Sequence, residues 1–70
     1  MDILDIIAAA PTTSNNWVNQ TTGGNMEAIL TFKTATAATA VARELRAAGA
    51  LVSTKNSGYG ETLLMAIWQE

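Results

Sequence analysis

Few residues in this 70-residue chain have side chains that could do chemistry. The chain contains no His and no Cys, which removes the commonest general base, the commonest thiol nucleophile and the usual zinc ligands. Ser14, Ser53 and Ser57 have no imidazole to activate them, and the acidic residues are spread from Asp2 to Glu70. Asp2 and Asp5 are close on a helix, where capping and favourable charge explain them better than a metal pair. We therefore expect a protein that is not an enzyme and that uses no cofactor and no metal.

Residues 55–60 form the best candidate site for a small ligand. Two glycines free backbone amides that, beside a lysine, could hold an anion, and the tyrosine ring could stack on a nucleotide base. No helix follows this segment, so it matches neither a P-loop nor a dinucleotide fingerprint, and a plain hairpin turn is the simpler interpretation. The candidate ligand-binding residues are Lys55, Ser57, Gly58, Tyr59 and Gly60.

Large apolar side chains are the candidates for contacts with another protein. Tryptophan is over-represented among interface hot spots, so Trp17 is an anchor for a partner if it is exposed. The more frequent arrangement is a buried tryptophan, which would make residues 11–25 a packed arm. The full set of candidate interaction residues is Trp17, Ile29, Tyr59 and Trp68 as apolar anchors, with Arg43 and Arg46 as charges at the rim.

Composition restricts the classes of partner. The formal net charge is −2, and four Lys and Arg residues neutralise too few phosphates for a nucleic-acid binder. No run approaches the roughly 18–20 apolar residues that span a bilayer, and Asp2 and Asp5 replace the cationic start of a signal peptide. We expect a cytoplasmic protein that binds neither nucleic acid nor membrane. A chain this short without disulfides has a marginal core, so association with itself or with another protein is expected to supplement it.

The central element of the expected fold is residues 61–68, an extended run that is apolar on both sides. A strand with one face in water would alternate apolar and polar residues, so this strand is expected to be covered on both faces. The two sets of alternating positions are Leu63, Met65 and Ile67, and Leu64, Ala66 and Trp68.

A helix is predicted over residues 35–48, with Thr34 or Thr36 as its N-cap and Gly49 as its left-handed C-terminal residue. Residues 26–33 alternate as a half-buried strand, and residues 50–54 form another strand after the helix. A crossover between these two strands leaves a gap that the 61–68 strand fills, antiparallel to both. The predicted fold is α+β, with a three-stranded sheet of the split β-α-β type.

The amino-terminal part is predicted to be a short amphipathic helix over residues 2–10, stopped by Pro11. A polar, partly irregular connecting segment follows, with room for a short extended piece around Trp17. Residues 1–25 thus form a helix and polar arm, and residues 26–70 form the β-α-β-β core, in one domain. The 35–48 helix covers one face of the sheet. The other face is covered by the 2–10 helix folding back, by a second copy or by another protein.

Small size, missing catalytic groups and an uncovered face predict a non-enzymatic protein–protein interaction module. Domains of this kind are often encoded by phages and mobile elements as inhibitors that bind and block a host protein, so we expect a viral type of inhibitor or a homo-oligomer. The alternative is a homo-oligomeric binder that sequesters a small anionic ligand, such as a nucleotide, at residues 55–60.

Overall fold

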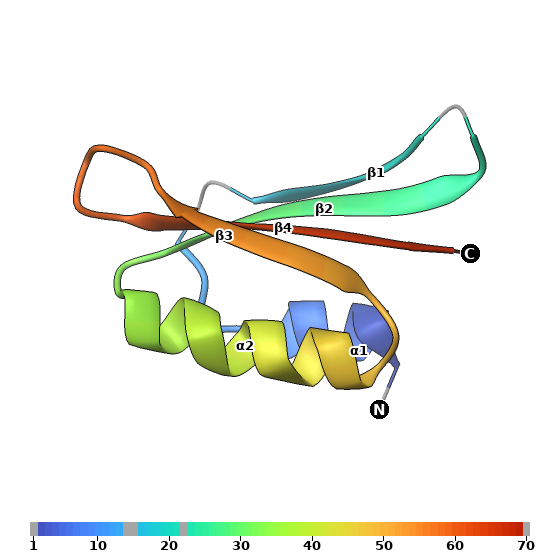
Figure 1. Ribbon diagram of the computed structural model, residues 1–70, viewed down its shortest axis with the longest axis horizontal. Helices are drawn as coiled ribbons and strands as arrows, with labels where there is room; N and C mark the ends of the chain where they lie inside the picture. Colours follow the sequence, from blue (N-terminus) through green and yellow to red (C-terminus); the bar gives the residue numbers. More distant parts are fainter. Residues whose placement is uncertain (1, 14–15, 22, 70) are drawn as a thin grey trace.

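The computed structural model describes residues 2–13, 16–21 and 23–69. It is an α+β fold with two helices and a four-stranded antiparallel sheet in the order β1-β2-β4-β3 (Figure 1). The elements in chain order are α1 (Ile3–Ala9), β1 (Trp17–Gln20), β2 (Asn25–Phe32), α2 (Ala35–Ala47), β3 (Leu51–Asn56) and β4 (Thr62–Gln69). The α+β class is therefore confirmed.

The prediction of three strands is wrong, because β1 is a fourth strand at the edge of the sheet. It forms a hairpin with β2, in which Trp17 lies opposite Ile29. The turn is closed by the N–H of Thr21, which donates to the carbonyl of Asn25 (2.7 Å), and it uses a positive φ of 86° at Gly24. All four residues of β1 are exposed. Their sequence, Trp-Val-Asn-Gln, lacks the apolar–polar alternation by which a half-buried strand is recognised.

The centre of the sheet is as predicted. β4 pairs along its whole length with β2, and it also pairs with β3 on its other side. β2 and β3 are both antiparallel to β4, so they run parallel to each other, with α2 as the connection between them. The double-sided apolar strand is thus one of the two inner strands.

The ends of α2 follow from local chemistry. The Thr34 side chain accepts a hydrogen bond from the N–H of Ala37 (3.1 Å), which confirms the predicted N-cap. At the other end Gly49 has a φ of 103°, and the N–H groups of Gly49 and Ala50 donate to the carbonyls of Arg46 and Leu45 (both 3.0 Å). This is a Schellman motif, which requires a residue that tolerates positive φ.

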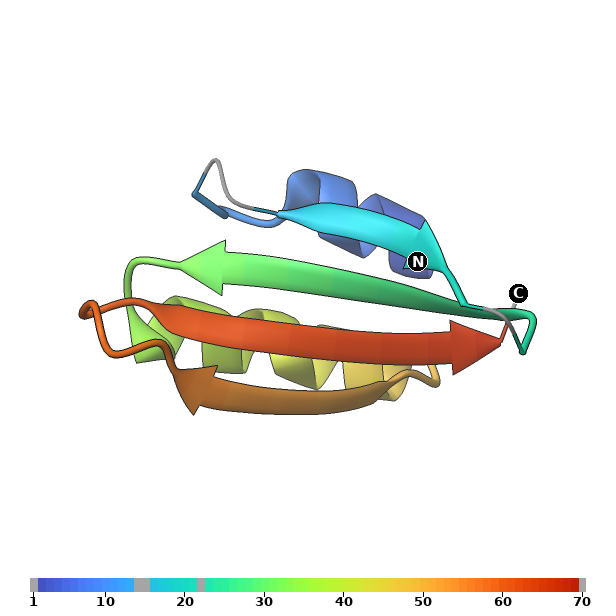
Figure 2. The same ribbon diagram turned by 90° about the horizontal axis from the view of Figure 1, so that it is seen from above.

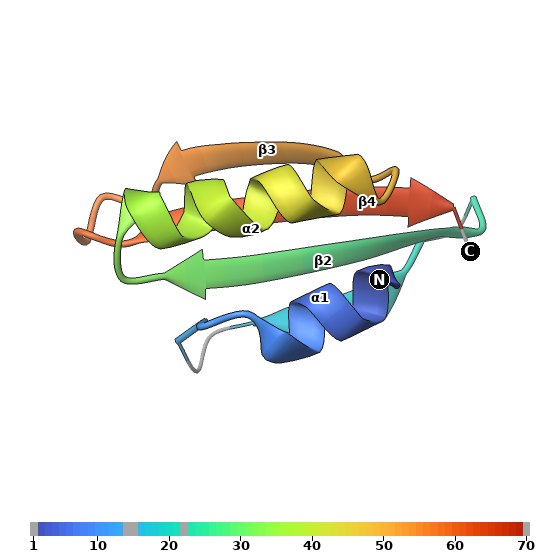
Figure 3. The ribbon, with the colours of Figure 1, turned by 90° about the horizontal axis from the view of Figure 1, so that it is seen from below.

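The short helix α1 packs beside α2 on the same face of the sheet (Figures 1 and 3). It buries Ile3 and Ile6 in the common core and ends before Pro11, as predicted. Asp2 occupies the N-cap position, but its side chain makes no capping hydrogen bond, so that expected role is not found.

The molecule therefore has two layers, with both helices on one side of the sheet. Its principal extents are 32 × 24 × 18 Å, and Figure 2 shows the sheet from the side that carries no helix. Of the three covers considered for the second face, the 2–10 helix is ruled out, since α1 lies on the first face with α2. The core lies between the helices and the sheet; its fully buried large side chains are Leu30, Phe32, Leu45 and Leu64.

Candidate functional site

The candidate site is the side of the sheet turned away from the helices, which we call the open face. Its residues are identified by register, because residues that pair across antiparallel strands point to the same side. Trp17 pairs with Ile29, Ile29 with Met65, and Met65 with Ser53, so these four form one row across the sheet. The apolar residues of the open face are Trp17, Ile29, Leu51, Leu63, Met65 and Ile67.

The open face exposes more apolar surface than a covered sheet would. Leu51 is 76% exposed, Trp17 49% and Met65 40%, and the other three apolar residues are partly exposed. The largest contiguous apolar patch on a monomeric protein, typically about 300–600 Å², is often a site of interaction. The open face is therefore a candidate docking surface.

Two charged residues lie at open-face positions of the described strands, one of each sign. Glu27 is in the row of Ile67 and Leu51, and Lys55 is opposite Leu63. They flank the row of Trp17 on its two sides, and that central row contains no charge. The open face is thus electrically neutral and apolar along its middle.

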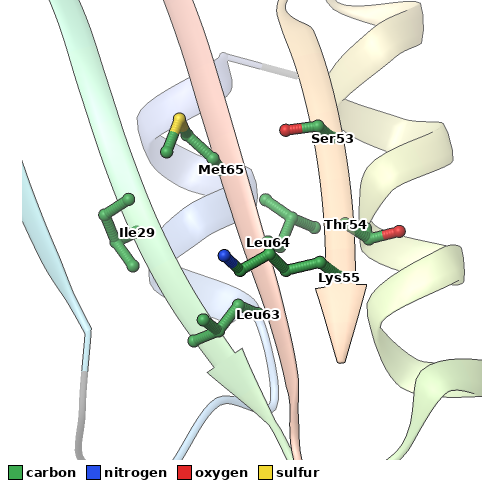
Figure 4. Close-up of a pocket in the computed structure, with 7 residues that line it drawn as sticks. All are labelled: Ile29, Ser53, Thr54, Lys55, Leu63, Leu64 and Met65. Atoms are coloured by element: carbon green, nitrogen blue, oxygen red, sulfur yellow. The ribbon is translucent and has the colours of Figure 1, made fainter. Parts of the chain in front are cut away.

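A hollow of about 240 Å³ lies on the β4–β3 side of the open face. Figure 4 shows Ile29, Leu63 and Met65 around it, with the Lys55 side chain directed from β3 across β4. Its volume is below the roughly 300–1,000 Å³ of typical small-molecule sites. Its size suits one large side chain better than a whole ligand. The residues that line it are Ile29, Ser53, Thr54, Lys55, Leu63, Leu64 and Met65.

The structure brings only part of the predicted interaction residues together. Trp17 and Ile29 share the central row of the open face, and Trp17 is not packed inside as the sequence favoured. Trp68 instead belongs to the core on the helix side, with 9% of its surface exposed. Trp68 lies four residues after Leu64 on the same strand, so it points to the same side, faces the helices and is not available as a surface anchor.

The predicted rim charges lie elsewhere. Arg43 and Arg46 are exposed on α2, and the Arg46 guanidinium donates to the carbonyl of Val52 on β3 (3.0 Å). Tyr59 is 90% exposed in the loop between β3 and β4. None of the three takes part in the open face.

Four open-face residues were missed as site residues by reasoning from sequence, namely Leu51, Leu63, Met65 and Ile67. The signal that identifies them is the alternation of side chains along a strand, in which every second residue points to the same face. Three of them form one of the two apolar sets of the central strand. The fourth pairs with Ile67. Choosing anchors by residue type selected Trp68 and omitted Met65 and Ile67 of the same strand.

The loop at residues 55–60 has the geometry of a turn. The N–H of Gly58 donates to Asn56 Oδ1 (2.9 Å) and the N–H of Tyr59 to Ser57 Oγ (3.3 Å). The N–H of Ser57 donates to the carbonyl of Glu61 (2.9 Å). Three amides that an anion would need are already bonded within the loop. The predicted ligand site draws no support from this arrangement.

The described residues contain no group of three or more Asp or Glu side chains that could hold a metal ion. Within the same part of the chain, neither helix is long and apolar enough to cross a membrane. Comparisons of the sequence with known protein families and with curated proteins, and of the fold with solved structures, found no match.

Proposed function

We propose that this protein is a non-enzymatic protein–protein interaction module whose docking surface is the open face. The observation that carries the proposal is the two-sided apolar strand β4. One set of its side chains is buried against the helices, and the other set, Leu63, Met65 and Ile67, is left without cover by the described chain. A partner that covers these three side chains would form a second apolar core with them, on the side of the sheet opposite to the helices.

The energetics favour such docking. Removing apolar surface from water contributes roughly 25 cal/mol per Å², and aromatic anchors such as Trp17 contribute most when they enter a pocket. Glu27 and Lys55 flank the apolar row, which is the arrangement of an apolar centre with a polar rim. The open face therefore has the composition of an interface core.

The mode of action that fits this surface is steric occupancy. The molecule offers one broad apolar side, and its sequence contains no His or Cys, so binding itself would be its effect on a target. A phage or mobile-element inhibitor that covers a functional surface of a host protein would work in this way. The same surface would serve a homo-oligomer.

Photo-crosslinking in the native host cells tests the proposal. Benzoylphenylalanine replaces Met65 in the open face, and in a matched control it replaces Thr39, which is exposed on α2. We expect ultraviolet light to give discrete protein adducts from position 65 and none from position 39. Absence of adducts from position 65, with the folded protein present, would overturn the proposal.

A further inference from the structure

We infer that the occupant of the open face is a second copy of the chain, packed face to face so that Trp17 of each copy enters the hollow of the other. This inference rests on the proposed function and specifies its partner. Symmetric homodimers are the commonest oligomers, and their contacts occur twice, once on each side of the axis.

The register of the central row carries the inference. Across the sheet the row reads Trp17, Ile29, Met65, Ser53, from the edge strand β1 to the edge strand β3. A two-fold axis in the interface, parallel to the strands, reverses this order in the second copy. Trp17 then lies over Ser53 and Ile29 lies over Met65. The largest side chain of the row meets the smallest, and the two middle apolar residues meet each other.

The hollow is at the place that this symmetry requires. It lies on the β4–β3 side, with Ser53 and Met65 among its lining residues, and its volume of about 240 Å³ suits one large side chain. Lys55 lies beside it, where its ammonium group can contact the face of an incoming indole ring. Trp17 is 49% exposed, so it reaches the second copy without leaving a packed position.

The available area is sufficient for a dimer. Strands about 4.8 Å apart, rising about 3.4 Å per residue, give a face of three six-residue strands and the four-residue β1 a projected area of roughly 350 Å². With the relief of the side chains, two such faces bury on the order of 1,000 Å², the lower limit for a specific interface. Aligned sheet packing, with strands crossing at about 30°, accommodates an axis close to the strand direction. This axis places Glu27 of each copy over Ile67 of the other, so the two carboxylates lie near each other beside the axis, and the apolar contacts of the central row must outweigh their repulsion.

Sedimentation equilibrium of the purified protein tests the inference over a concentration range of roughly 1 µM to 1 mM. We expect association to twice the 7.4 kDa monomer mass. Trp17→Ala should weaken association at least tenfold, because it removes a hot spot. Tyr59→Ala, which removes an aromatic ring that is 90% exposed off the open face, should leave it unchanged. Circular dichroism at low concentration checks that each variant is folded.

A complementary pair of variants tests the specific contact. Trp17→Lys and Ser53→Glu should each be monomeric alone, since each places a charge in the central row. Mixed together they should form a heterodimer, in which Lys at position 17 faces Glu at position 53 and the second contact is wild type.

Three results would overturn the inference. They are a wild-type monomer at every concentration, a dimer that Trp17→Ala leaves intact, and a mixture of the complementary variants that stays monomeric. The proposed function fails separately. Adducts of position 65 with a different protein would support it while excluding the second copy, and adducts with neither would overturn both.

Discussion

The side chains on the two sides of β4 are almost equally apolar, but they differ in their exposure to solvent. Leu64 and Ala66 are fully buried under the helices, whereas Met65 between them is 40% exposed on the open face. Both sides are apolar enough to form a core. The difference lies in where the chain places its two helices, since α1 and α2 share one face of the sheet. Apolarity thus shows that a surface is suited to burial, and topology decides whether the same chain supplies the cover.

The largest expected contrast is between neighbouring leucines on the two sides. Leu64→Ala leaves a cavity in a packed core and should lower the free energy of unfolding by about 2–5 kcal/mol. Leu63→Ala, on the partly exposed side, should lower it by only about 1 kcal/mol in the monomer. Urea denaturation at low protein concentration measures both. Equal losses would mean that the two faces are covered alike.

A smaller effect is expected where α2, the main cover of the buried face, ends. Gly49→Ala places a side chain at a φ of 103° with nothing within 4 Å of the new Cβ, so backbone strain alone should lower stability. That strain is worth about 1–2 kcal/mol. Gly23→Ala is the matched control, because Gly23 also has open space around it but no positive φ. Thermal melts of the two variants should separate; identical melts would contradict the Schellman end.

The smallest predicted effect is at the start of α2. Thr34→Ala removes the hydrogen bond to the N–H of Ala37 and should lower the free energy of unfolding by about 1 kcal/mol. Thr34→Ser should restore most of the loss. Thr36 is the second residue of α2, and Thr36→Ala should have no such cost, since alanine has a higher helix propensity than threonine. If Thr36→Ala costs as much as Thr34→Ala, the cap assignment is wrong.

The elements that sequence reasoning predicted well are those with a strong local signal. The Ala-rich helix with Thr34 before it and Gly49 after it was located to within a residue, and β4 was placed correctly between its neighbours. The extended piece around Trp17 was not predicted to be a strand of the sheet, because its residues carry no periodic pattern and only pairing with β2 makes it a strand.

Two of the residues that the sequence analysis chose as anchors, Trp17 and Ile29, lie on the open face, and the others do not. Two-sided apolarity in residues 61–68 indicated that both faces of the strand require cover, but it left open what covers the second face. The choice of anchors by residue type then selected Trp68, which the parity of the strand places in the core. Long-range packing decides which side of the sheet α1 covers. The sequence of a short amphipathic helix shows which of its own faces is apolar, but not which side of the sheet that face packs on.

The most direct test of the account is the solvent accessibility of individual methyl groups on β4, measured by NMR relaxation from a soluble gadolinium chelate. In dilute protein, the methyls of Leu63 and Met65 should relax strongly and those of Leu64 should not. On association, with a second copy or another partner, Leu63 and Met65 should become protected while Leu64 stays unchanged. Protection of both sides in dilute protein would contradict the open face, and lasting exposure of Leu63 and Met65 in the bound state would contradict its role in binding.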